Sequence, residues 1–153
     1  MSGEETRFFL LCRAGTVLCA LPVACVIETM RPLSFDMLPG SPHFVVGMAI
    51  VRGASLPVIV VSRLFDKEEK RPERLVIARV GSRCVGLAVD EVIGVRALAA
   101  ETLQELPPLL RDASQEAVAG IGTLDGELLV VLKAARIVPA EVFAIAETEA
   151  AAS

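Results

Sequence analysis

The chain has no tryptophan and no tyrosine, and its 153 residues include six phenylalanines and a single histidine. The formal net charge is −4. Nucleic-acid binding needs a basic face, and single strands also need aromatic rings on which bases can stack. The sequence therefore predicts a protein that has no nucleic-acid partner.

Long apolar runs are also missing, although 54% of the residues are hydrophobic. The longest stretches without a charged residue are 14–27 and 37–51, and both contain proline and glycine. A membrane-spanning helix needs about 20 apolar residues. The first seven residues carry more acid than base, unlike the start of a signal peptide. We expect a cytoplasmic protein without direct membrane insertion.

Closely spaced metal ligands are absent as well. Cys12, Cys19, Cys25 and Cys84 form no Cys-x-x-Cys pair, and the lone His43 has no histidine partner. Zinc sites use clustered cysteine and histidine ligands, so we predict no metal and no cofactor. In a reducing compartment the four thiols are expected to be small buried hydrophobic residues.

Convergent polar groups of the kind that catalyse reactions are equally scarce. Asp90 and Glu91 are neighbours, and neighbours on a strand point to opposite faces, so we expect a solvated strand end there. Gly120 and Gly122 lack the Lys-Ser/Thr of a phosphate-binding loop, so Gly120 is expected to serve a turn. The sequence predicts no enzyme and no catalytic residue.

What the sequence does contain is an internal repeat. With Gly81 placed under Gly15, apolar residues match at a spacing of 66, and 47–53 matches 120–126 at a spacing of 73. The matching runs are short, rich in Val, Ile and Leu, and bounded by turn residues, which is typical of β-strands. We predict an all-β duplicated unit with halves at 7–66 and 73–138. Because one copy is too small for a good core, residues 1–153 are expected to form a single domain.

Turn and helix signals complete this prediction. Gly15, Gly81 and Asp125-Gly126 are expected at turns, since glycine and aspartate tolerate a positive φ angle. Short helical turns are expected at 62–65 and 101–106. The segment 139–153 opens with proline and is rich in alanine and glutamate, so we expect a C-terminal helix and tail.

An ordered set of segments between about residues 7 and 138 resembles the CheW family of chemotaxis proteins. No single segment is diagnostic, but the ordered set is specific. The segments are Phe9–Gly15, Ala20–Val23, Val26–Glu28, Leu38–Pro42, Val46-Gly47, Arg52-Gly53, Leu56–Val58, Val85–Val92 and Gly120–Val130.

This resemblance implies a fold and two partners. The fold would be two packed SH3-like barrels. The partners would be the cytoplasmic tip of a methyl-accepting receptor, lying in a groove between the barrels, and the regulatory domain of a CheA-type histidine kinase. Matched by position, Val26, Glu28, Arg52 and the adjoining Gly53 would take part in receptor binding.

Two residues depart from the pattern of the family. Ile50 stands where the family usually has asparagine, and Val60 stands where it often has aspartate. Both lost groups could hydrogen-bond turn backbones, so the loop that carries Arg52 would be held differently. The output could then be flagellar motility, pili, gliding or gene expression. Two other functions stay open: a small-molecule-binding domain that uses the groove, and a decoy that has lost one partner.

Overall fold

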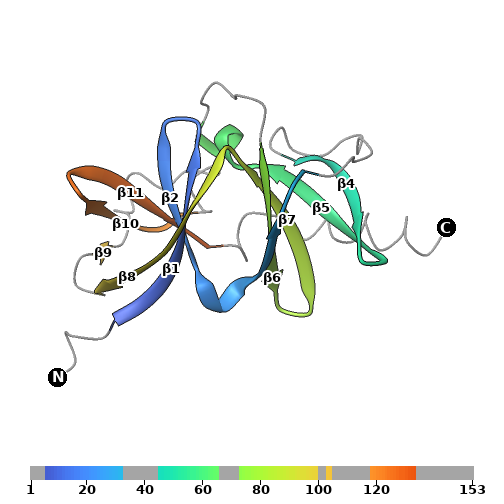
Figure 1. Cartoon of the computed structure of the whole chain (residues 1–153), viewed down its shortest axis with the longest axis horizontal. Coiled ribbons are helices and arrows are strands. Elements are labelled where there is room, and N and C mark those ends of the chain that lie inside the picture. Colours follow the sequence, from blue (N-terminus) through green and yellow to red (C-terminus); the bar gives the residue numbers. More distant parts are fainter. Residues whose placement is uncertain (1–5, 33–44, 66–72, 100–102, 105–117, 134–153) are drawn as a thin grey trace.

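The computed structural model describes residues 6–32, 45–65, 73–99, 103–104 and 118–133, and these form two β-sheets (Figure 1). The sheets curl into two small SH3-like barrels, as expected. Barrel A is the six-stranded sheet, in the order β8 (Glu91–Ala99), β1 (Thr6–Ala14), β2 (Val17–Pro22), β11 (Glu127–Leu132), β10 (Val118–Leu124), β9 (Leu103–Gln104). Barrel B is the five-stranded sheet, in the order β3 (Val26–Met30), β6 (Arg74–Val80), β7 (Arg83–Val89), β5 (Ala54–Val60), β4 (Val45–Val51).

Each barrel takes strands from both halves of the sequence. The first hairpin, β1–β2, joins β8, β10 and β11 from the second half, while β6–β7 joins β3, β4 and β5 from the first. The two halves thus exchange hairpins, and each exchanged hairpin is held in its barrel by a parallel strand pair. These pairs are β11 with β2 and β5 with β7. The two sequence halves therefore do not correspond to the two barrels.

The repeat extends to fine detail of the backbone. In barrel B a register shift falls between Val26 and Glu28. In barrel A the equivalent shift falls between Val92 and Gly94, which pair with Cys12 and Leu11. The turn glycines Gly15 and Gly81 have φ angles of 61° and 63°. A bulge bends a strand and adds local twist, so the same bends recur in both barrels.

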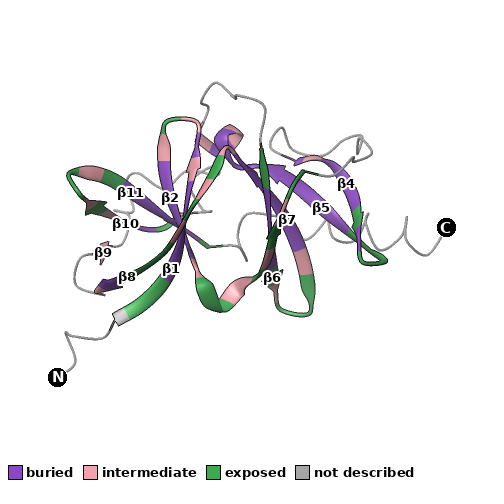
Figure 2. Cartoon of the chain, viewed as in Figure 1, coloured by how far each residue is buried: buried purple, intermediate pink, exposed green. Residues whose placement is uncertain are grey.

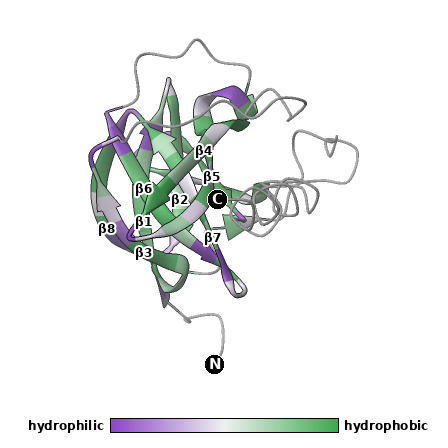
Figure 3. Ribbon diagram, turned by 90° about the vertical axis from the view of Figure 1, so that its right-hand side faces the viewer, coloured by the Kyte–Doolittle hydropathy of each residue, from purple (hydrophilic) through white to green (hydrophobic). Residues whose placement is uncertain are grey.

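Alternation along the central strands builds three apolar cores. On β1, Phe9 and Leu11 point into barrel A, whereas Leu10, Cys12 and Ala14 point into a seam between the barrels. On the equivalent β6, Leu75 and Ile77 point into barrel B, and Val76 and Ala78 into the seam. Strands that are buried on both faces need apolar residues at nearly every position. The strand interiors are accordingly buried (Figure 2) and hydrophobic (Figure 3).

The short helical elements agree only in part with the sequence-based predictions. The turn expected at 62–65 is the 3-10 helix η3 (Val61–Phe65), and a second one, η2 (Val23–Cys25), links β2 to β3. The prediction of a helical turn at 101–106 is wrong for Leu103 and Gln104, the two residues of this segment that the structure describes. They form the strand β9, which pairs with β10. The expected C-terminal helix lies outside the described residues.

Gly120 also differs from its prediction. It lies inside β10 opposite Val131, just after a register shift, and is not at a turn. The true turn of this hairpin is Asp125-Gly126, with φ angles of 52° and 81°. A glycine beside a bulge can look like a turn glycine in sequence, since both interrupt a strand pattern.

We expect Gly86→Val to destabilise barrel B. A Cβ atom at Gly86 would lie 3.1 Å from the Cδ1 atoms of both Leu56 and Leu75. Overpacking of this kind costs about 1–3 kcal/mol. Urea unfolding should show the loss in the free energy of unfolding, whereas Ala97→Val on the exposed face of β8 should change it little. Equal stability of the two variants would mean that Leu56 and Leu75 can move aside.

Candidate functional site

Two of the residues expected at the receptor site lie together in barrel B. Arg52, in the β4–β5 turn, donates from Nε to Oε2 of Glu28 at 2.8 Å and from Nη2 to Oε1 at 2.9 Å. Glu28 lies on β3, and β3 and β4 are the outer strands of this sheet. The ion pair therefore joins the two ends of the sheet and helps to close the barrel.

The two side chains of this pair differ in how far they are exposed. The Arg52 side chain is 76% exposed and that of Glu28 only 25%. The hydrogen bonds from Arg52 lower the pKa of the Glu28 carboxyl, and Glu28 in turn raises the pKa of Arg52. Most of the guanidinium stays open to a second contact, because a guanidinium has more donors than one carboxylate engages.

The turn that carries Arg52 is tightly constrained. Arg52 and Gly53 have φ angles of 52° and 83°. Two successive positive φ angles are typical of the type I′ turn, whose twist matches that of the flanking strands. Gly53 thus allows a conformation that holds Arg52 at the tip of the hairpin.

Val26 plays a more internal role than its partners. It starts β3, is half-buried and packs against the core of the seam. The next residue, Ile27, lies at the register shift and is 43% exposed. Ile50, which precedes the Arg52 turn, is 69% exposed.

Ile27 and Ile50 are thus apolar side chains on the surface within two residues of the ion pair. Sequence reasoning noted Ile50 only as a departure from the family and missed Ile27. A one-residue bulge changes which side chains face outward, and the alternation of the sequence does not reveal it.

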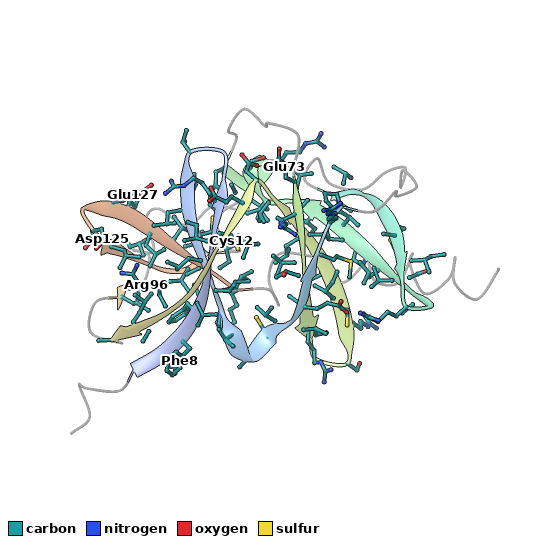
Figure 4. All side chains as sticks on the ribbon, viewed as in Figure 1. Phe8, Cys12, Glu73, Arg96, Asp125 and Glu127 are labelled. Carbon is teal, nitrogen blue, oxygen red and sulfur yellow. The ribbon has the colours of Figure 1, made fainter. Side chains whose placement is uncertain are left out.

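Barrel A also has an ion pair at the equivalent hairpin tip, where aspartate replaces the arginine. Nη2 of Arg96 on β8 lies 3.7 Å from Oδ2 of Asp125, which is equivalent to Arg52 in the repeat (Figure 4). Nearby, Arg13 donates from Nη1 and Nη2 to the Glu127 carboxylate at 2.6 and 3.0 Å. These bonds lower the pKa of Glu127.

Asp90 differs from the expected solvated strand end. Its Oδ2 accepts a hydrogen bond from the Gly15 backbone N–H at 3.1 Å, and its own N–H donates to the Arg13 carbonyl at 2.8 Å. Asp90 therefore ties the β7–β8 junction to the β1–β2 turn. Glu91 is exposed.

Two of the four thiols are deeply buried. Cys12 and Cys19 are buried opposite each other on β1 and β2, and burial raises the pKa of each to about 12. Cys25 and Cys84 are half-buried, and all four are free. Within the described ranges no three His, Cys, Asp or Glu side chains lie close enough to hold a metal ion. His43 lies outside those ranges.

The described part of the chain also contains no helix of the length and apolar character that a membrane crossing requires.

Comparison with known proteins gives a consistent result. Residues 9–142 match the family model of the CheW-like domain. The chain is 32% identical over 125 residues to Protein FrzA of Myxococcus xanthus, covering 80% of this chain and 77% of that one. It is 27% identical over 107 residues to the chemotaxis protein CheW of Rhizobium meliloti, covering 68% and 69%.

Among solved structures, the scaffolding protein TtCheW of Thermoanaerobacter tengcongensis has the same fold. The TM-score is 0.73 at 23% sequence identity, and the match covers 84% of this chain and 90% of that one. Because the family model spans most of the chain and includes both barrels, this protein belongs to the CheW-like domain family.

Proposed function

We propose that this chain is a non-enzymatic adaptor in a chemotaxis-type signalling complex. It would couple the cytoplasmic tip of a methyl-accepting receptor to the regulatory domain of a CheA-type histidine kinase, and would act in the cytoplasm by binding alone. Family membership over residues 9–142 and the names of its relatives support this role.

The observation that carries the receptor assignment is the Glu28–Arg52 pair. A bidentate ion pair at the tip of a hairpin presents a fixed, mostly exposed guanidinium. Arginine anchors are typical of interface hot spots, and the exposed Ile27 and Ile50, close to the pair in sequence, add apolar surface to the same barrel. Gly53 would fix the position of the turn, and Val26 would support β3 from behind.

Barrel A offers a different surface for the kinase domain. Phe8 on β1 is 60% exposed and Val95 on the neighbouring β8 is 56% exposed. Figure 4 shows Phe8 pointing away from the barrel. The equivalent residues of barrel B are Arg74 and Thr29, so this apolar surface is particular to barrel A. Two unlike surfaces allow two partners to bind at once.

We expect Arg52→Glu to lose receptor binding and to keep kinase binding. Charge reversal at an anchor should weaken the receptor complex by at least about tenfold. The measurement is a pull-down of wild type and variant against a receptor-tip fragment and against the kinase regulatory domain. Arg96→Glu is the control, since it reverses the charge of the arginine that pairs with the equivalent hairpin tip of barrel A.

Equal loss of receptor binding in Arg52→Glu and Arg96→Glu would mean that the stability of the fold, and not direct contact with Arg52, matters. If wild type binds neither partner, the adaptor role is wrong, and the small-molecule-binding or decoy function should replace it.

We expect the stability supplied by Glu28 to disappear in acid. Arg52 holds the pKa of Glu28 below its ordinary value of 4.5, so the pair stabilises the fold above that pH. The contribution is lost as the pH falls through the lowered pKa. The difference in unfolding free energy between wild type and Glu28→Gln should therefore shrink from about pH 7 to about pH 3. Glu73→Gln is the control, and a difference independent of pH would contradict the prediction.

Exchanging the charges of Glu28 and Arg52 distinguishes a role in barrel closure from direct contact with the receptor. Combining Glu28→Arg with Arg52→Glu preserves an ion pair between β3 and the hairpin but presents the opposite charge to a partner. We expect urea unfolding close to wild type together with lost receptor binding. Restored receptor binding would show that the residues act only through barrel closure.

A further inference from the structure

A pocket of about 490 Å³ lies where the two barrels meet. Its apolar surface comes from barrel A residues such as Pro22 and Leu103, which are half-buried, with the almost fully buried Phe9 and Leu132 behind them. Val80 and Gly81 of barrel B form part of its other side. An occupant would therefore contact both barrels.

Three cations from separate strands surround this pocket. Arg7 belongs to β1, Arg79 to β6, and Lys133 follows β11; all three are exposed. The described lining residues include no acidic side chain, and none of the three cations forms an ion pair with a carboxylate of the described residues. Like charges that line one pocket repel one another, so binding of an anion there is favoured.

The repeat provides an internal comparison for these cations. The residue equivalent to Arg7 is Glu73, the residue equivalent to Lys133 is Val60, and Arg13, equivalent to Arg79, is neutralised by Glu127. The same fold thus forms on the other side of the seam without three unpaired cations. The fold therefore does not require three cations around this pocket.

We propose that this pocket binds a small amphipathic organic anion. Its apolar chain would lie against the half-buried Pro22, Val80 and Leu103, and its carboxylate or phosphate head would meet Arg7, Arg79 and Lys133. The volume is within the range of small-molecule pockets, about 300–1,000 Å³.

The lining favours such a ligand over a highly polar metabolite. Apart from the three cations, the one polar side chain among the described lining residues is the Cys25 thiol, which already donates to the Pro22 carbonyl at 3.1 Å. Recognition would therefore rest on apolar contact and charge together. This site goes beyond the adaptor role and does not depend on it.

The test is a calorimetric titration of the full chain with octanoate and with octyl phosphate, which measures the affinity for each anion. Octanol lacks the charge and acetate lacks the chain, so both should bind at least about tenfold more weakly. Arg7→Ser, Arg79→Ser and Lys133→Ser should each reduce octanoate affinity about two- to fivefold. Arg74→Ser, which removes an exposed cation outside the pocket, should leave the affinity unchanged.

Protection of Cys25 gives a second readout at the site. In a Cys84→Ser variant, Cys25 is the remaining thiol that is not deeply buried, and octanoate should slow its alkylation while octanol should not. Equal binding of octanol or acetate, an equal effect of Arg74→Ser, or no binding of either anion would overturn the proposal. Occupation by an acidic peptide alone would also overturn it, and would assign the pocket to a protein partner.

Discussion

The seam between the barrels is the constraint on which the rest of the structure depends. Strands β1, β2, β6 and β7 send alternate side chains into their own barrel and into this shared core. Each of these strands is consequently buried on both faces and must be apolar almost throughout. The high hydrophobic content of the chain is explained by this seam and not by a membrane. Each barrel alone is too small to form a good core, and the shared core supplies the missing burial.

Strand exchange makes each barrel depend on both halves of the sequence. Because β1–β2 completes the barrel that the second half supplies, and β6–β7 completes the other, neither sequence half contains a whole barrel. The parallel ladders β2–β11 and β5–β7 can form only when both halves are present. A change in one barrel should therefore reach the other through the shared apolar core of the seam, as the proposed adaptor role would require.

Duplication also left equivalent positions free to diverge. The hairpin tip carries Arg52 in barrel B and Asp125 in barrel A, and each pairs with a strand across its barrel. The β1–β8 surface exposes Phe8, where the other copy has Arg74. Backbone geometry is retained at such positions because turns and bulges set it. Surface chemistry is free to change, since little packs against it.

The sequence alone determined the strand class, the repeat and the hairpin turns, because alternating apolar runs and positive-φ residues are local properties. The family resemblance also predicted that Glu28 and Arg52 belong to one site. Only the tertiary structure decided that the halves exchange strands, that Gly120 lies in a strand and that Asp90 caps a distant turn. It also exposed Ile27 and gathered Arg7, Arg79 and Lys133 around one pocket. These features depend on register shifts and on contacts between strands far apart in the chain, and no local pattern of residues encodes them.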